Sequence, residues 1–321
     1  MKRFLVTVLV LLMVSTAAFA AGRRADDGQK RVAFIARAQG DAFAAWLANS
    51  MIAEAALIPT ISLTVFDGQA ADHVVNNHID NAIVNRFDLI ILQPNNGEAQ
   101  TPAVRRVVNA GIPIILTNPR IPGLEYITHS VDADPFEQAA VGARLALTQV
   151  PQGGHVVVLN GPAGNMHSTE RRRAWNEVFF SARPDVQIVG EQIANWNKDE
   201  AMRHMEDWVT AHGRIDAVIS MNDNMAAGAL EVTRGMARFN NLLVYGVDGT
   251  AEAALLIQEG LLTATSFQNA YELARTSIRL AYDILTGRVT GLVNVDIDCP
   301  LITIDNVAYL FDAHRAAGAL D

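Results

Sequence analysis

Cysteine is nearly absent from this chain, which has one, Cys299, among 321 residues. A single cysteine forms no internal disulfide, so the fold does not depend on oxidative cross-links. Aromatic residues make up 7% of the chain and charged residues 18%, against 50% hydrophobic residues. These proportions are those of an ordinary globular protein, and they exclude disordered, collagen-like and coiled-coil chains.

Positive charge is in short supply, because 25 lysines and arginines face 34 aspartates and glutamates, which gives a formal net charge of −9. Binding to a phosphate backbone depends on clustered basic side chains that release counterions. We therefore expect no nucleic-acid partner. At roughly 100 to 200 residues per domain, the length predicts two domains.

Long apolar runs are confined to the N terminus, where Lys2 and Arg3 precede an apolar run over residues 4–14. Small residues follow and end in Ala-Phe-Ala at 18–20, the pattern that signal peptidase cleaves. The run is shorter than the roughly 20 residues that span a bilayer. Residues 1–20 are therefore predicted to be a cleaved signal peptide, and the mature chain is expected in the periplasm. An uncleaved anchor is the alternative.

The common enzymatic motifs are also missing. The chain contains no Gly-x-Ser-x-Gly turn, no phosphate-binding loop ending in Lys-Ser or Lys-Thr, and no His-Glu-x-x-His zinc motif. Its histidines are scattered, and His73 and His78, five residues apart, do not share one helix face. We predict a protein that is not an enzyme and that holds neither a metal nor another cofactor. Cys299 has apolar neighbours and is interpreted as a small buried residue.

What the chain does contain is a repeated alternation of short apolar runs and longer segments of helical periodicity. The predicted strands are 31–36, 61–66, 88–93, 112–117 and 126–131, then 155–159, 186–192, 217–220, 242–245 and 262–266. Predicted helices between them include 42–56, 70–85 and 99–110. This pattern is typical of parallel strands joined by crossover helices. It predicts an α/β fold of two doubly wound parallel-sheet lobes, with ligands at the carboxyl ends of the strands.

Unusual polar and aromatic residues gather at those predicted strand ends. They are Arg37, Asp41 and Phe43 after the first strand, Asn118 after the fourth, Arg171 at a helix start, Trp196 after the seventh strand, Asn222 after the eighth, Asp248 after the ninth and Gln268 after the tenth. A sugar hydroxyl both donates and accepts, so carboxylate, amide and guanidinium groups together satisfy it. The C–H faces of a ring rest on aromatic side chains. The set predicts a site for a sugar or polyol, although a helix-start arginine such as Arg171 also occurs on surfaces.

Two motifs in sequence, NDNMAAGA at 222–229 and VYGVDGT at 244–250, resemble the paired signature of the periplasmic sugar-binding proteins similar to ribose-binding protein. The resemblance runs from about residue 31 to the C terminus and includes AGIPII at 110–115 and Glu-Arg at 170–171. It implies a type I periplasmic binding protein that closes on one small ligand and delivers it to an ABC permease. It also implies that these residues line the cleft: Phe43, Asn118, Arg171, Trp196, Asn222, Asp248 and Gln268. We expect a monomer, and a chemotaxis receptor is a further candidate partner.

The resemblance also implies three connections between the lobes, near 131–134, 267–270 and 294–298. Residues 21–132 plus 269–295 would form the N-terminal lobe, including a long helix over 270–286. Residues 133–268 plus 296–321 would form the C-terminal lobe. A three-stranded hinge of this kind lets the lobes rotate and close around the ligand.

Departures from the family pattern leave the ligand open. Asn118 and Pro119 stand where many relatives have Asp-Arg, so a carboxylate that accepts twice is replaced by an amide. Phe43 is followed by two alanines, with Trp46 three residues on, so one stacking face is lost or moved. Arg37 stands where a small residue is common, and it either reaches into the cleft or pairs with a surface carboxylate. A pentose, a hexose and a cyclic or linear polyol all fit.

The sequence leaves three other functions to consider. The same fold could bind a non-sugar ligand such as a quorum signal or an amino acid. A sugar-responsive transcription regulator would need an N-terminal helix-turn-helix where this chain has its export signal. An exported carbohydrate-active enzyme would need a pair of catalytic carboxylates flanking the scissile bond.

Overall fold

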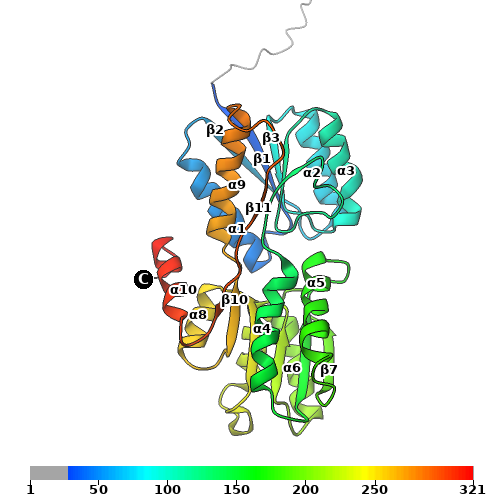
Figure 1. The fold of residues 1–321 in the computed structure, drawn as a ribbon, viewed down its shortest axis with the longest axis vertical. Helices are drawn as coiled ribbons and strands as arrows, with labels where there is room; N and C mark the ends of the chain where they lie inside the picture. Colours follow the sequence, from blue (N-terminus) through cyan, green and yellow to red (C-terminus); the bar gives the residue numbers. More distant parts are fainter. Residues whose placement is uncertain (1–27, 321) are drawn as a thin grey trace, which may run out of the picture.

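The computed structural model describes residues 28–320, and the predicted signal peptide lies outside the described residues. The chain forms two six-stranded sheets, stacked one above the other and each covered by helices (Figure 1). Every strand pair is parallel except that of β10 with β12. The predicted fold class, two parallel-sheet α/β lobes, is confirmed. Within residues 28–320, no helix combines the length and hydrophobicity needed to cross a membrane.

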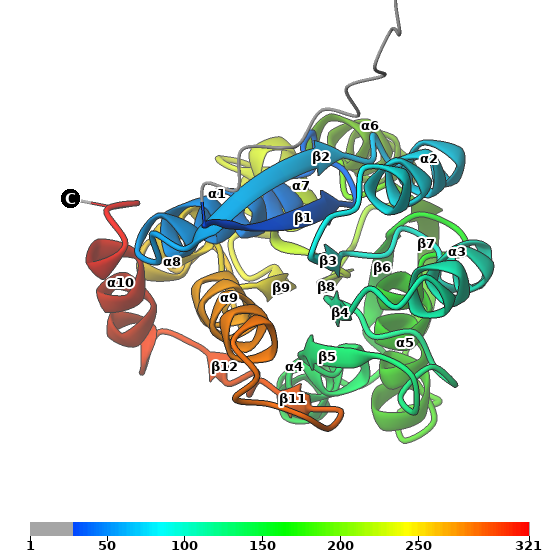
Figure 2. The same cartoon turned by 90° about the horizontal axis from the view of Figure 1, so that it is seen from above.

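The N-terminal lobe has the strand order β11-β5-β4-β3-β1-β2, which Figure 2 shows from above. Its strands are β1 (Lys30–Ala36), β2 (Ile61–Asp67), β3 (Leu89–Leu92), β4 (Ile114–Thr117), β5 (His129–Asp132) and β11 (Asn294–Asp296). Its helices are α1 (Ala42–Ala56), α2 (Asp72–Val84), α3 (Gly97–Asn109) and α9 (Ala270–Leu285).

The continuous apolar sequence of β1 follows from its burial on both faces. Val32 and Phe34 belong to the core between the sheet and helices α1 and α9. Ala33 and Ile35, which alternate with them, pack with α2 and α3 on the opposite face. A strand covered on both faces has no solvent side that could take polar residues. This is why residues 32–36 are all apolar, and why the sequence predicted a strand here.

The C-terminal lobe has the strand order β12-β10-β9-β8-β6-β7. Its strands are β6 (His155–Asn160), β7 (Gln187–Ile193), β8 (Ala217–Ser220), β9 (Leu243–Asp248), β10 (Ala264–Phe267) and β12 (Leu301–Ile302). Its helices are α4 (Pro135–Gln149), α5 (Met166–Ala174), the π-helical turn η1 (Trp175–Phe180), α6 (Lys198–Ala211), α7 (Asp223–Thr233), the short η2 (Ala237–Phe239), α8 (Ala251–Gln258) and α10 (Val307–Ala316).

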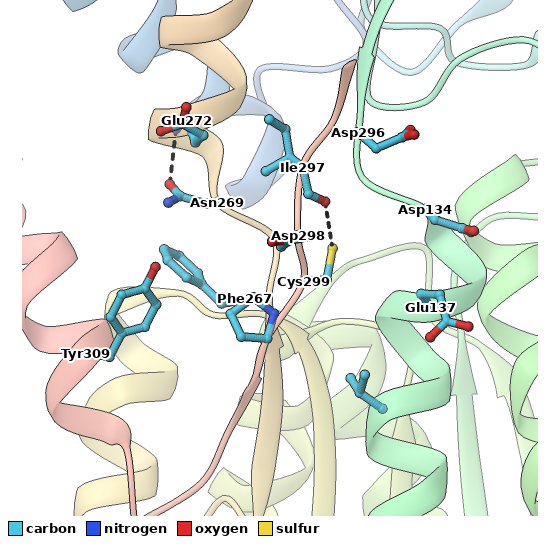
Figure 3. Close-up of a pocket in the computed structure, with 12 residues that line it drawn as sticks. Asp134, Glu137, Phe267, Asn269, Glu272, Asp296, Ile297, Asp298, Cys299 and Tyr309 are labelled. Carbon is cyan, nitrogen blue, oxygen red and sulfur yellow. Dashed lines mark hydrogen bonds between the residues drawn. The ribbon is translucent and has the colours of Figure 1, made fainter. Parts of the chain in front are cut away.

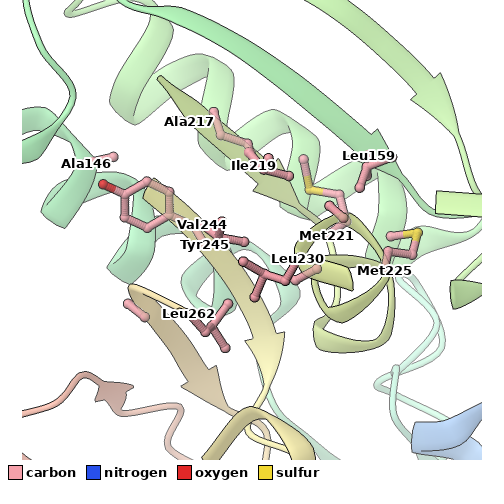
Figure 4. Close-up of a cluster of buried hydrophobic side chains, with 14 of the residues drawn as sticks. Ala146, Leu159, Ala217, Ile219, Met221, Met225, Leu230, Val244, Tyr245 and Leu262 are labelled. Carbon is pink, nitrogen blue, oxygen red and sulfur yellow. The ribbon is translucent and has the colours of Figure 1, made fainter. Parts of the chain in front are cut away.

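The core of this lobe lies between β8, β9 and their covering helices. Ile219 and Val244 on neighbouring strands belong to one buried cluster with Met225 and Leu230 of α7 (Figure 4). Tyr245 is buried in the same cluster, and its hydroxyl donates to Gln149 Oε1 at 2.9 Å. The residues that follow β8 and β9 are therefore carried on strands that are packed into the core of this lobe.

The fifth predicted strand was placed three residues too early. Residues 126–128 form a turn, in which the backbone N–H groups of Ile127 and Thr128 both donate to Leu124 O at 3.0 Å. Tyr126 is 86% exposed, so its aromatic ring does not belong to the buried core that the predicted strand required. β9 in turn extends beyond the predicted 242–245, because Val247 and Asp248 continue to pair with β10.

Three segments run between the lobes (Figure 1). Residues 133–134 join β5 to α4, residues 268–269 join β10 to α9, and residues 297–300 join β11 to β12. Helix α9 packs with the core of the N-terminal lobe, whereas α10 contributes Leu310 and Phe311 to the core of the C-terminal lobe.

Candidate functional site

A cavity lies between the two lobes, and we call it the interlobe cavity. Its volume is about 20 Å³, so the side chains of the two lobes leave little free space between them. Its walls are Arg37, Asp41, Phe43 and Asn118 from the N-terminal lobe and Asn165, His167, Arg171, Trp196, Asn222 and Asp248 from the C-terminal lobe. Eight of the nine sequence-predicted site residues therefore line one space. The ninth, Gln268, lies behind Arg171 and is described below.

The connection from β1 to α1 contributes a buried ion pair. Asp41 caps α1 by accepting from the backbone N–H of Ala44 at 2.9 Å, and Arg37 Nη2 lies 3.0 Å from Asp41 Oδ1. Both side chains are 9% exposed. The two interpretations of Arg37 were therefore not exclusive, because it reaches the cavity and pairs there with a carboxylate. That carboxylate is buried rather than on the surface.

Phe43 lines the cavity, but Trp46, the other candidate for a stacking face, does not. The Trp46 ring stands edge-on to Phe43 at 5.5 Å between centroids and stacks with Phe267 of the other lobe at 6.3 Å. It thus belongs to an aromatic cluster beside the cavity. Of the two alternatives left by the sequence, the second aromatic face has moved out of the site.

Asn118 ends β4 with a left-handed backbone, φ 43°, and its side chain is buried. Arg120, two residues on, does not line the cavity. Its guanidinium pairs instead with Asp132 and Asp296, at the ends of β5 and β11. The N-terminal lobe therefore presents the Asn118 amide to the cavity, and not the Arg120 guanidinium.

Arg171 is the most heavily bonded side chain of the site. Its Nε and Nη2 donate to Gln138 Oε1 at 2.9 and 2.6 Å, and its Nη1 donates to the carbonyl of Met221 at 2.6 Å. Nη2 also reaches Gln268 Oε1 at 3.0 Å and Asp248 Oδ1 at 3.3 Å. These bonds fix the guanidinium plane at the cavity wall, so Arg171 is not a surface arginine.

Gln138 and Gln268 hold Arg171 from behind, next to two of the connections between the lobes. Gln268 follows β10, and Gln138 on α4 bonds both to Gln268 and to the carbonyl of Ala133. Gln268 was predicted to line the cleft, but it is not among the cavity residues. Gln138 was missed, because a glutamine inside an amphipathic helix carries no signal of function in the sequence.

Asp248 sits at the end of β9 with an unusual φ of 122°. Burial raises its pKa well above the ordinary range, Arg171 opposes this, and the nearby Asp223 adds to it. Asp223 itself accepts from Thr265 Oγ1 at 2.7 Å and from the Thr250 N–H at 3.0 Å, and burial raises its pKa to about 7. Asp248 thus lines the cavity, and Asp223 lies behind it as a second buried carboxylate.

Trp196 follows β7 with a left-handed φ of 62°. Its ring lies against Gly161, where any Cβ atom would overlap the indole, and Arg171 Cζ lies 5.6 Å from the ring centroid. Asn222 caps α7 by accepting from the Met225 N–H at 2.9 Å. Left-handed or otherwise rare backbone at Asn118, Trp196 and Asp248 concentrates strain at this site, which is typical of functional positions.

Two cavity residues, Asn165 and His167, were missed from the sequence. Both follow the turn at 161–164, which contains two glycines and connects β6 to α5. Asn165 caps α5 through its Oδ1, and its Nδ2 donates to the carbonyl of Asn95 in the opposite lobe at 3.2 Å. The turn was therefore the signal, because it ends β6 at the same sheet edge as the other site residues.

Unpartnered polar atoms gather in the interlobe cavity. Among the described residues, ten buried side-chain nitrogen or oxygen atoms have no hydrogen-bond partner. Four of them belong to cavity residues: Asn118 Nδ2, Trp196 Nε1 and both ring nitrogens of His167. Buried polar atoms are normally bonded, so this concentration indicates that a polar molecule completes the site.

A second, larger hollow of about 1050 Å³ lies along the connections between the lobes (Figure 3). Its walls include Asp134, Glu137, Glu272, Asp296, Asp298 and Cys299. Burial raises the pKa of the Cys299 thiol to about 12, so this cysteine is not a reactive thiolate. The carboxylates do not converge, and the described residues contain no cluster of three or more side chains placed to bind a metal.

Two α/β lobes that enclose a buried polar cavity define a protein that binds a small solute. The chain belongs to the family of the periplasmic binding protein domain, which matches residues 32–288. The resemblance stated from the two motifs is thereby confirmed. Members of this family bind solutes, and the chain is a binding protein rather than an enzyme.

Individual relatives agree in fold and class. The chain is 26% identical to the xylitol-binding protein of Mycolicibacterium smegmatis over 232 residues, which cover 72% of this chain but only 65% of that protein. It is 29% identical to the D-apiose import binding protein of Paraburkholderia graminis, over 73% of this chain and 75% of that one. The solved structure of an ABC transporter solute binding protein from Bacillus halodurans, with bound myo-inositol, superposes with a TM-score of 0.82 at 26% identity, covering 90% of this chain and 99% of the other.

Proposed function

We propose that this protein captures one neutral monosaccharide or polyol between its lobes and delivers it to an ABC importer. The observation that carries the proposal is that the Arg171–Asp248 pair shares one interlobe cavity with unpartnered polar atoms from both lobes. A polyhydroxylated ring supplies acceptors and donors on every edge, so it satisfies these groups together. The relatives named for xylitol and D-apiose, and the neighbour with myo-inositol, support this ligand class.

The charge of the cavity favours a neutral ligand. Its two arginines are each matched by a carboxylate within the cavity, Arg37 by Asp41 and Arg171 by Asp248. An anionic sugar would meet two guanidinium groups that are already neutralised. An amino acid would need one free carboxylate and one free cation, and the cavity walls offer no such separated pair.

The small volume of the cavity means that the lobes have to move apart to admit a ligand. The cavity measures about 20 Å³, far below the ~300–1000 Å³ of typical ligand pockets. Phe43 and Trp196 supply the apolar faces on which the C–H surfaces of a sugar ring rest. An oligosaccharide would require a wider separation of the two lobes than a single ring does.

Capture and release follow from the three connections between the lobes. When the lobes open about these connections, Arg37, Phe43 and Asn118 leave the groups on the C-terminal lobe, and solvent enters. A ligand that contacts both walls binds the closed state more tightly, so it shifts the population toward closure. We propose that the mature protein is a periplasmic monomer, exported by the signal over residues 1–20, and that the permease and a chemotaxis receptor read its closed form.

A thermal-shift screen of the chain from Ala21 onward tests the function. The panel contains D-ribose, D-allose, xylitol and myo-inositol, with L-leucine and L-glutamate as non-sugar controls. A ligand that binds only the folded state adds about 4 kcal/mol at a thousandfold excess over Kd, so a genuine ligand raises Tm clearly. A shift with one or two polyols and none with the amino acids is expected. A shift with an amino acid alone overturns the ligand class while leaving the fold intact.

A further inference from the structure

His167 lines the interlobe cavity, but it takes no part in the hydrogen bonds and ion pairs that hold the other cavity residues. It lies in the first turn of α5, between the capping residue Asn165 and Arg171, and its side chain is buried. Neither ring nitrogen makes a hydrogen bond of normal geometry, although both are fully buried. A buried imidazole without a well-formed hydrogen bond costs free energy unless something else bonds to it.

The groups that face His167 come from every element around the cavity. Arg171 lies one turn further along α5 and Arg37 on the β1–α1 connection, and both act on the His167 ring as like charges. Asn118 approaches from β4 of the other lobe with an unpartnered Nδ2. The carboxylates of the cavity, Asp41 and Asp248, are each engaged by one of the arginines and not by His167.

A protonated imidazole is therefore disfavoured in the closed cavity. Burial, then the charge of Arg171, then that of Arg37 lower the pKa of His167 well below 6.5, and the backbone of Asn118 opposes this. Opening the lobes moves Arg37 and Asn118 away and admits water, so the ring returns toward its ordinary pKa of ~6.5. The neutral ring offers one donor and one acceptor, which matches a single hydroxyl group of a polyol.

We propose that His167 binds a ligand hydroxyl in its neutral form, and that proton uptake by this side chain opens the lobes and releases the ligand in acid. This inference rests on the proposed function, and it adds a specificity-determining residue and a pH dependence to it. The open state binds the proton more readily than the closed state. The contribution of His167 to closure is therefore complete above pH 6.5 and is lost as the pH falls below it.

Protonation of two other groups in the site has the opposite effect on closure. The pKa values of Asp248 and Asp223 are raised by burial in the closed state, so acid favours closure through them. The overall pH dependence of binding is thus a sum of opposing contributions. A comparison between the wild-type protein and a variant without the imidazole isolates the part that belongs to His167.

The test is calorimetric binding at pH 7.5 and pH 5.0 with wild type, His167→Gln, His167→Asn and the control His73→Gln, which removes an exposed histidine of α2. The probe is the member of the panel D-ribose, D-allose, xylitol and myo-inositol that binds the wild type most tightly at pH 7.5. Both His167 variants should bind it more weakly at pH 7.5, because a hydroxyl partner is altered or lost.

Between pH 7.5 and pH 5.0, the wild-type affinity should fall relative to that of the His167 variants by roughly thirtyfold, the value for an open-state pKa of ~6.5. His73→Gln should follow the wild type at both pH values. Equal pH dependence in the wild type and both His167 variants would overturn the inference and leave the proposed function standing. A wild-type protein that binds none of the four compounds at pH 7.5 would overturn both.

Discussion

Tyr271 and His314 join the two lobes beside the cavity, with 3.1 Å between Tyr271 Oη and His314 Nδ1. Tyr271 lies on α9 of the N-terminal lobe and His314 on α10 of the C-terminal lobe. His314 Nε2 is 2.9 Å from the carbonyl of Gly249, which only accepts, so Nε2 donates and Nδ1 accepts from the tyrosine hydroxyl. Trp46 packs its ring against both side chains. The arrangement of the lobes is thus stabilised outside the three connections.

Replacing Tyr271 with Phe should weaken ligand binding without touching the cavity. The change removes one interlobe hydrogen bond of about 0.5–1.5 kcal/mol and so favours the open state. The Kd measured by calorimetry should rise about threefold to tenfold. Tyr126→Phe is the matched control, because Tyr126 is in the same lobe and exposed. Identical affinities for the two variants would show that the contact does not stabilise closure.

Gly246→Ala should destabilise the fold. A Cβ atom at Gly246 would overlap Asp223 Oδ1, the atom that accepts from Thr265. Overpacking of this kind costs ~1–3 kcal/mol, which a lowered Tm will report. Gly213→Ala in the same lobe is the control, because nothing lies within 4 Å of its Cβ position. A Gly246→Ala protein as stable as the control would refute the packing role assigned to this glycine.

Trp196 should report lobe closure by fluorescence. It lines the cavity and is one of four tryptophans in the chain. Ligand binding should change its emission, and Trp196→Phe should abolish most of that change. Trp208→Phe removes a buried tryptophan of α6 that is not a cavity residue, and it should keep the signal. A full signal in Trp196→Phe would place the reporter elsewhere.

The sequence was sufficient for the fold because strands buried on both faces, such as β1, leave continuous apolar runs. It was also informative for most of the cavity, because polar residues that follow parallel strands meet at one sheet edge. It could not reveal Gln138, whose role depends on a contact with Arg171 from a distant helix. The same reason explains why Gln268 was predicted to line the cavity. A residue at a strand end can either line the cavity or hold a lining residue in place, and Gln268 does the latter for Arg171.

The sequence also could not predict in which direction a side chain points. Trp46 has the sequence position of a stacking residue, but its ring packs among Phe267, Tyr271 and His314 instead of lining the cavity. His167 occupies a helix start that reads as ordinary in sequence. Its importance appears only when Asn118 and Arg37 of the other lobe are placed opposite it.

Calorimetric titration of the mature chain and of Arg171→Ala tests the central claim most directly, with the panel compound that gives the largest thermal shift. The account predicts one site per chain and a loss of more than tenfold in affinity for the variant, equivalent to ~2–4 kcal/mol. Arg173→Ala, which removes an exposed arginine of the same helix, should bind as the wild type does. Wild-type affinity in a folded Arg171→Ala protein, or no binding of any polyol by the wild type, would contradict the account.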